Sequence, residues 1–210
     1  MCTALLGIYV FTGEDCNAAF KGKGKTKAVK ILQSKSEYIP VFADLGESWR
    51  LEKTTFKGLQ KFVCELYGLS RYSSVNKARL FKLKNMVGIK SKITRKCKID
   101  LYKLPPCKNS LLPHAYRVNF QTRRLKLSHQ PCPDIPDPAP DHGWRVNEEG
   151  LLEPQWTTGE VLPLRVVDVL SKETTSDTDS DDDSDSEVDS DRDIDTESGP
   201  DSDWSDIEMQ

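Results

Sequence analysis

Glycines and lysines alternate in a short stretch near the start of the chain, at residues 20–28. Apolar residues and good helix formers follow from position 28, so we expect a helix to begin at the glycines. The first amides of a helix have no partner inside it and carry partial positive charge, an arrangement that binds phosphate. The stretch therefore predicts a site for the phosphate backbone of a nucleic acid. Its candidate residues are Lys21, Gly22, Lys23, Gly24, Lys25 and Lys27.

Two other interpretations of this stretch are open. Gly24-Lys25-Thr26 occurs in nucleotide-binding P-loops, but that motif needs another glycine five residues earlier, where this chain has Ala19. No clear strand precedes the stretch either. The remaining alternative is a lysine-rich loop that is simply solvated, because charge runs often lie on a protein surface without binding anything.

The stretch and its surroundings resemble the helix–turn–helix part of the 5′-nuclease (flap-endonuclease-like, PIN-like) superfamily. The matching residues are an apolar segment at 5–11, Gly13-Glu14-Asp15, Phe20-Lys21-Gly22-Lys23-Gly24 and Ala28. The resemblance implies an element that grips duplex DNA through its phosphates, often with a monovalent cation in the turn. It also implies that Asp15 is one of several carboxylates that hold two metal ions. Lys23 departs from the family, which usually has an apolar residue there.

The chain resembles more closely a group of transposon-associated proteins that carry a degenerate domain of this kind. This resemblance is carried by residues 12–25, by Leu104-Pro105-Pro106-Cys107 and by Gly143-Trp144, and it covers most of residues 5–165. Members of this group often end in a cysteine-rich segment, whereas this chain ends in acidic residues. We therefore expect the two C-terminal parts to differ in role.

The carboxylates needed for two-metal hydrolysis are not together in this sequence. Such a site needs several acidic ligands, and only Asp15, with Glu14 beside it, lies where the resemblance places one. In the family the other ligands come from an upstream segment, so we expect the chain to be a fragment of a larger fold. We predict no catalytic residue and no required cofactor, with Asp15 as a vestigial ligand for Mg²⁺ or a monovalent cation. The alternative is a metal-dependent nuclease fragment that needs its N-terminal half.

The charges of this 210-residue chain divide into a basic body and an acidic tail. Residues 171–210 hold 17 acidic and 2 basic side chains, which leaves residues 1–170 with 28 basic and 16 acidic ones. A body this basic favours DNA or another nucleic acid, held without sequence preference. Basic residues also concentrate at 90–98, as a second phosphate-contacting cluster or a nuclear-import signal.

The tail at residues 171–210 is a Ser/Asp/Glu repeat with one aromatic residue, so we expect it to be disordered. Its acidic side chains should compete with nucleic acid for the basic body, and phosphorylation should add to that effect. Two alternatives give the tail other roles: it binds basic proteins, or it only keeps the chain soluble. The sequence also leaves open a remnant without retained function.

Cysteines, histidines and apolar runs exclude several classes of protein. The six cysteines are scattered without Cys-x-x-Cys spacing, which argues against a zinc site. The N-terminus does not read as a signal peptide, and no apolar run reaches the roughly 18 residues of a membrane span. We expect an intracellular protein, nuclear rather than cytoplasmic, with no membrane partner. His114 and His129 are predicted to lie at the surface or an interface.

Hydrophobic periodicity predicts a mainly α fold, a helical bundle with a helix–turn–helix near its N-terminus. Apart from that element, helices are expected at residues 37–45, 51–69, 73–84 and 113–129. A small hairpin is expected near residues 143–160, with Trp144 and Trp156 packed on the bundle. The predicted organisation is a helical domain at 1–130, a proline-rich linker at 131–142, a tryptophan-containing segment at 143–170 and the tail.

Overall fold

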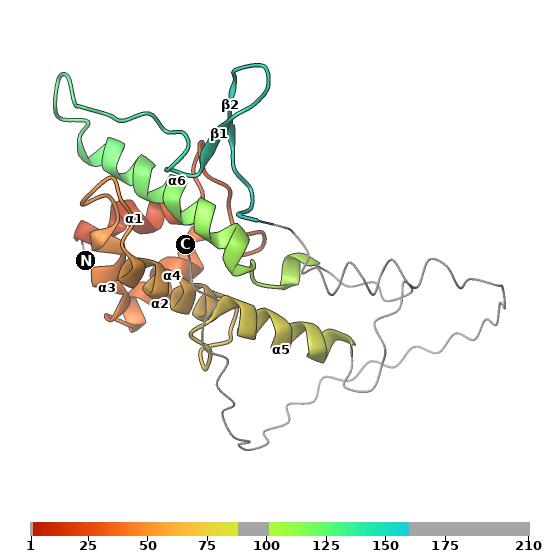
Figure 1. The fold of residues 1–210 in the computed structure, drawn as a ribbon. Helices are drawn as coiled ribbons and strands as arrows, with labels where there is room; N and C mark the ends of the chain where they lie inside the picture. The colour runs from red at the N-terminus through yellow and green to blue at the C-terminus, as the bar shows by residue number, and fades with distance from the viewer. Residues whose placement is uncertain (1, 88–100, 160–210) are drawn as a thin grey trace, which may run out of the picture. The chain divides into compact units, whose positions relative to one another are not determined.

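The computed structural model describes residues 2–87 and 101–159, all within the first of two units, Met1–Pro163 and Leu164–Gln210. The described residues form a mainly helical fold with one two-stranded hairpin (Figure 1), as predicted. The elements are α1 (Cys2–Phe11), α2 (Lys25–Ser34), α3 (Tyr38–Asp44), α4 (Lys53–Leu66), α5 (Val75–Val87), the 3₁₀ turn η1 (Leu101–Lys103), α6 (Lys108–Lys126), β1 (Trp144–Val146) and β2 (Leu152–Pro154).

The core lies where α1, α3, α4 and α6 meet. Three aromatic rings from the first three of these helices, Phe11, Phe42 and Phe62, are fully buried and meet edge to face. Their ring centroids are 4.7 to 6.1 Å apart, within the range that favours such aromatic pairs. α6 runs across this group of helices (Figure 1). The core therefore fixes the end of α1, from which the turn to α2 begins.

Gly7 allows α1 and α3 to pack unusually closely. A Cβ atom at this position would lie 2.3 Å from the carbonyl oxygen of Phe42, so any larger residue would push the two helices apart. The apolar segment at the start of the chain is a helix with one face buried, which sequence periodicity alone could not distinguish from a strand.

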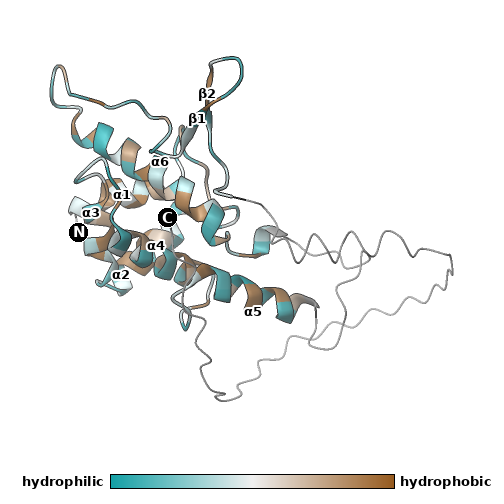
Figure 2. Ribbon diagram, viewed as in Figure 1, coloured by the Kyte–Doolittle hydropathy of each residue, from teal (hydrophilic) through white to brown (hydrophobic). Residues whose placement is uncertain are grey.

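Most helix bounds fall within a few residues of the predicted ones. The helix predicted at 51–69 is α4, and its predicted apolar stripe is buried in the core. It ends as predicted at Gly68, whose φ of +75° suits glycine, with the amide of Leu69 bonded to the carbonyl of Cys64 at 2.8 Å. In Figure 2, polar and apolar residues alternate along α5 and α6, the two helices at the border of the bundle.

The predicted start of the last helix at Pro113 is wrong. α6 begins five residues earlier, at Lys108, and continues through Pro113. Proline has no amide hydrogen, so the carbonyl of Asn109 cannot receive its usual helical bond. Thr158 supplies that bond instead, from its backbone nitrogen at 2.9 Å and its Oγ1 at 3.2 Å. A contact with a residue 49 positions further along the chain than Asn109 therefore allows a helix that proline would otherwise interrupt.

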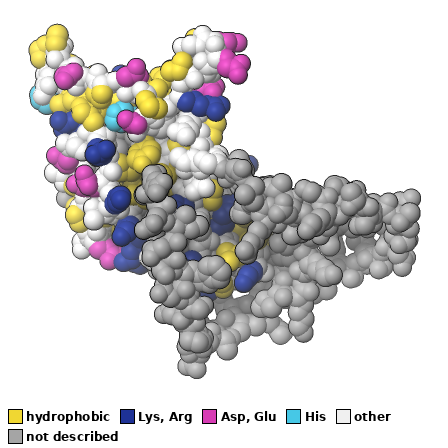
Figure 3. Space-filling view, in the orientation of Figure 1, with side chains coloured by type: hydrophobic (Ala, Val, Ile, Leu, Met, Phe, Trp, Pro, Cys, Tyr) yellow, Lys and Arg dark blue, Asp and Glu magenta, His cyan; other side chains and the backbone are white. Residues whose placement is uncertain are grey.

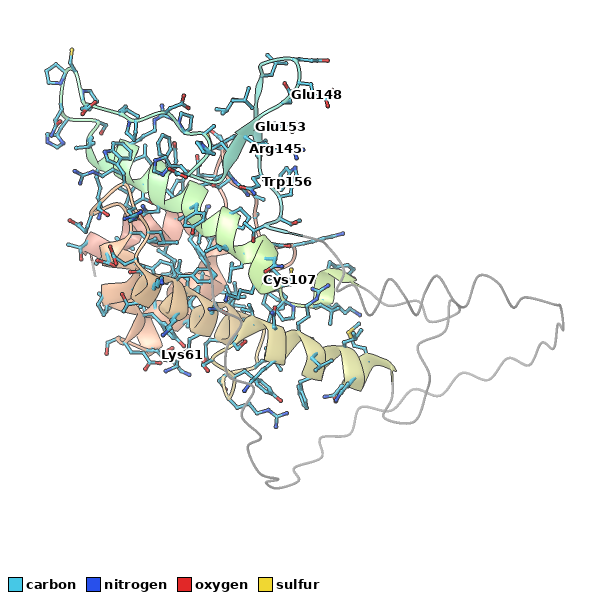
Figure 4. All side chains as sticks on the ribbon, viewed as in Figure 1. Lys61, Cys107, Arg145, Glu148, Glu153 and Trp156 are labelled. Atoms are coloured by element: carbon cyan, nitrogen blue, oxygen red, sulfur yellow. The ribbon has the colours of Figure 1, made fainter. Side chains whose placement is uncertain are left out.

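The predicted hairpin is formed by β1 and β2, an antiparallel pair in which Trp144 lies opposite Pro154. Arg145 and Glu153 pair across it, with 2.6 Å between Nε and Oε1 (Figure 4). Acidic side chains gather at its tip (Figure 3). Trp156 lies over the guanidinium of Arg117 but remains 61% exposed, so the expectation that it packs into the bundle is only partly met.

Several predicted features lie outside the described residues. These are the basic cluster at 90–98, the end of the segment at 143–170 and the acidic tail at 171–210. In the part of the chain that is described, no helix has the length and apolarity needed to cross a membrane.

Candidate nucleic-acid interface

Phe20 anchors the turn between α1 and α2 to the core. Its ring centroid lies 5.2 Å from that of Phe11 and 5.3 Å from that of His114 on α6. The prediction that His114 lies at the surface is wrong, since it is only 7% exposed. Its Nε2 lies 3.1 Å from the carbonyl oxygen of Phe11, and burial lowers its pKa to about 4. The neutral ring thus donates a hydrogen bond to the last carbonyl of α1 and packs against Phe20, which stabilises the turn between α1 and α2.

The first residue of the turn also has a fixed geometry. Thr12 continues the end of α1, with its Oγ1 donating to the carbonyl of Ile8 at 2.7 Å. Gly13 has φ +107°, and a Cβ there would lie 2.6 Å from the Cβ of Ala19. Only glycine suits this position, because both the backbone angle and the close approach exclude a side chain.

The start of α2 is open to solvent. Gly24 precedes the helix in an extended conformation and provides no side-chain cap, while its carbonyl accepts from the amides of Lys27 and Ala28. By helix geometry, the amides of Lys25 and Thr26 have no partner inside α2. A Cβ added at Gly22 or Gly24 would meet no atom of the described chain within 4 Å. A ligand can therefore approach this helix end without moving any described residue.

Lys25 points back toward its own protein. Its Nζ donates to the carbonyls of Tyr9, at 3.2 Å, and Gly13, and lies 4.3 Å from the centroid of the Tyr9 ring. A cation at the C-terminal end of a helix is stabilising, because the exposed carbonyls carry partial negative charge. Lys25, which we predicted to contact phosphate, thus caps α1 and ties it to the start of α2.

The other lysines of the turn point toward aromatic rings of different elements. Lys23 Nζ lies 5.1 Å from the ring centroid of Tyr67, and Lys82 Nζ of α5 lies 5.9 Å from the same centroid. Lys21 Nζ lies 4.6 Å from the ring of Tyr102. Cations favour the negative faces of aromatic rings, so the rings hold these ammonium groups without supplying a countercharge.

The charges of three lysines act on Lys82, and we call the four residues, Lys23, Lys27, Lys82 and Lys103, the lysine cluster. Burial, followed by the charge of Lys27, lowers the pKa of Lys23. Burial also lowers the pKa of Lys82, and the charges of the other three cluster lysines lower it further. Within the described residues, no carboxylate pairs with Lys23, Lys27 or Lys82 within 4.0 Å. Lys23, Lys27 and Lys82 thus concentrate positive charge with little compensation from the described residues.

The glycine-lysine motif predicted Lys23 and Lys27 as members of this surface, but not Lys82, Lys103 and Tyr67. A signal for Lys82 was available in its helix. The buried residues Val75 and Ala78 define the inward face of α5, and Lys82 follows them at i+7 and i+4. A lysine on the inward face of a helix must either be paired or lie at the edge of the core. Lys82 is half-buried, as expected for a residue at that edge.

Asp15 is exposed in the turn. The adjacent Glu14 accepts a hydrogen bond at 2.8 Å from Nδ2 of Asn17, which helps to close the turn. Among the described residues, no group of three or more His, Cys, Asp or Glu side chains is placed to hold a metal ion.

Comparison with known proteins finds no family model that matches the chain, no similar curated protein and no similar solved structure. The resemblance to 5′-nucleases therefore stays a prediction from the motif.

Proposed function

We propose that this chain is a non-catalytic nucleic-acid-binding module that holds the phosphate backbone on one surface, formed by the start of α2 and the lysine cluster. The observation that carries this proposal is the convergence of Lys23, Lys27 and Lys82 from two helices and a turn, without a carboxylate among the described residues to neutralise them. The uncovered amides of Lys25 and Thr26 lie beside these charges.

The chemistry of this surface favours a polyanion over a single carboxylate. The neighbouring ammonium groups of Lys23, Lys27 and Lys82 repel one another, and a ligand with several adjacent negative charges relieves more of that repulsion than one with a single charge. Each phosphate that a lysine neutralises also releases condensed counterions, which favours binding at low salt. Contacts of this kind recognise the backbone and not the bases, so binding is tolerant of sequence.

The conformation of Gly24 supports the same proposal. Its φ of −68° and ψ of 162° are accessible to any residue, and no described atom would contact a Cβ there. Neither the backbone nor the protein's own packing therefore requires glycine at this position. A phosphate that approaches the first amides of α2 would require it, because a methyl group would lie in its path.

Charge reversal within the lysine cluster tests the proposal. We expect Lys23→Glu and Lys82→Glu each to weaken binding of a fluorescent oligonucleotide by roughly tenfold or more at low ionic strength. The matched control is Lys57→Glu, the same charge change at an exposed residue of α4 that is about 15 Å from Tyr67 along the helix. Equal weakening in all three variants would point to net charge alone and would remove the proposed surface. A nucleic-acid partner also favours a nuclear location.

A further inference from the structure

An open apolar cavity of about 490 Å³ lies between α1 and α2. Residues that line it include Leu5, Leu6 and Tyr9 of α1 and Val29 of α2. Leu5 is 43% exposed and Tyr9 is 50% exposed, so the apolar wall faces solvent. The volume falls within the range of roughly 300–1,000 Å³ typical of small-molecule sites.

Two polar side chains at this cavity, those of Thr12 and Lys25, are already bonded within the protein. Thr12 Oγ1 donates to the carbonyl of Ile8 at 2.7 Å, and Lys25 Nζ donates to the carbonyls of Tyr9 and Gly13. What the cavity offers a ligand is therefore hydrocarbon and part of a tyrosine ring. Such a surface suits a flat apolar group and provides little to distinguish one such group from another.

The cavity and the lysine cluster lie on different sides of the start of α2. Lys25 and Val29, four residues apart, share the side of the helix that lines the cavity. Lys27 is two residues from each of them, so it lies on nearly the opposite side of the helix. There its positive charge lowers the pKa of Lys23 and of Lys82. The open amides of Lys25 and Thr26 lie between them. A ligand with a phosphate at these amides has positive charge on one side and an apolar cavity on the other.

We propose that the cavity receives a base of single-stranded nucleic acid, stacked on Tyr9 while the adjoining phosphate lies at the start of α2. This inference rests on the proposed function and adds to it the class of ligand. A nucleotide joins a charged phosphate to a flat, largely apolar base, which matches the charged and apolar sides of this helix end. A base within a duplex is paired and stacked, so it cannot enter the cavity without leaving the helix.

The proposed site does not distinguish one base from another. Stacking is tolerant of sequence because every base has a flat face, and the polar atoms of Thr12 and Lys25 are engaged elsewhere. An acyl chain or an apolar protein segment also suits a hydrocarbon wall. Neither of them uses the lysine cluster and the open amides beside it, and for this reason we favour nucleic acid.

The experiment compares three labelled probes of equal length on the full chain at low ionic strength: oligothymidylate, an abasic strand with the same phosphates, and a duplex. We expect fluorescence anisotropy to give a Kd for oligothymidylate roughly tenfold below that for the abasic strand. Tyr9→Leu should reduce this ratio toward one, because it keeps an apolar side chain but removes the ring. Tyr9→Phe keeps the ring and should retain the ratio. Circular dichroism confirms that the variants are folded.

The outcomes separate this inference from the proposed function. Equal affinity for oligothymidylate and the abasic strand, with binding still lost in Lys23→Glu, overturns the base site and leaves the phosphate surface standing. Duplex binding as tight as oligothymidylate binding also overturns the inference. Absence of binding to all three probes overturns both proposals.

Discussion

Lys25 Nζ lies 3.2 Å from the carbonyl oxygen of Tyr9 and 4.3 Å from the centroid of the same residue's ring. One side chain at the start of α2 thus donates to a carbonyl near the end of α1 and lies over one face of the aromatic ring of the same residue. Lys23, two residues earlier, has a different environment, near Tyr67 and the other cluster lysines. The same residue type therefore stabilises the fold at one position and concentrates charge at the other.

The two lysines should respond in opposite ways to the same substitution. Lys25→Met removes two hydrogen bonds to carbonyls at an exposed helix end, so we expect the free energy of unfolding to fall by about 1 kcal/mol. Lys23→Met removes a repelled charge, so stability should be unchanged or higher while affinity for an oligonucleotide falls. Urea denaturation and fluorescence anisotropy measure the two effects. A stable Lys25→Met variant that binds as weakly as Lys23→Met would contradict this division of roles.

A substitution at Gly24 should weaken nucleic-acid binding while leaving the stability of the fold nearly unchanged. Gly24→Ala should change the free energy of unfolding by less than about 0.5 kcal/mol, because a less flexible unfolded chain offsets a poorer helix N-cap. Its affinity for nucleic acid should nevertheless fall severalfold, since the methyl group lies where a phosphate would approach the amides. Gly22→Ala is the contrasting variant: its φ of +70° makes alanine strained, so stability should also fall. Unchanged affinity in Gly24→Ala would show that no ligand contacts this helix end.

The salt dependence of binding counts the phosphate contacts. If Lys23, Lys27 and Lys82 each neutralise one phosphate of a single strand, log K should fall against log salt with a slope of about −2. Lys82→Met should reduce the magnitude of that slope by about 0.7, because one contact is lost. Anisotropy titrations over a series of chloride concentrations give both slopes. A variant with reduced affinity and an unchanged slope would place Lys82 outside the interface.

The sequence predicted the helices well because their apolar periodicity is strong. The stripe along α4 and the helix start after Gly24 follow from local spacing, and both are present in the structure. The hairpin was also predictable, since a turn at Gly150 separates two short strands. These features depend on residues close together in the chain, which is the information that a pattern contains.

Features that depend on contacts between distant residues could not be predicted from local patterns in the sequence. Nothing local distinguishes Lys23 from Lys25; their directions depend on Tyr67 and Tyr9, which other helices place beside them. The predicted start of α6 was wrong because Thr158 donates to the carbonyl of Asn109, which Pro113 cannot bond. His114 was predicted at the surface because its partner, the carbonyl of Phe11, lies 103 residues away.

Arg117 should hold the hairpin to the bundle. Its Nη1 donates to the carbonyls of Gly143 at 3.0 Å and Gln155 at 2.5 Å, and the side chain is almost fully buried. We expect Arg117→Met to lower the free energy of unfolding by about 2–3 kcal/mol, since two carbonyls lose a charged donor.

The local effect of Arg117→Met should be strongest in the hairpin itself. Amide hydrogen exchange in residues 143–156 should become faster while exchange in α4 stays slow. Arg124→Met is the matched control, because that arginine lies on the same helix but is exposed, and its Nη1 donates to Gln121 Oε1 at 3.3 Å. Equal losses of stability in both variants, or unchanged exchange in the hairpin, would contradict an anchoring role.

His114 should make the fold sensitive to mild acid. Its pKa is lowered to about 4 in the folded chain, chiefly by burial and also by the charge of Arg117, against an ordinary value of 6.5. Between these two values the unfolded chain binds a proton that the folded chain does not, so the stability present at pH 7 is lost as the pH falls. The loss from this group should be about 2 kcal/mol at pH 5 and about 3 kcal/mol once the pH is below 4.

Comparison with His114→Gln isolates this contribution, because carboxylates also titrate in the same range. Glutamine keeps a donor for the carbonyl of Phe11 but does not titrate, so its free energy of unfolding should fall less between pH 7 and pH 5. The variant should be less stable at pH 7, since it loses the ring contacts with Phe11 and Phe20. Urea denaturation at the two pH values gives the difference directly. Parallel losses in both proteins would mean that His114 titrates normally and that the turn is not supported by a neutral, buried ring.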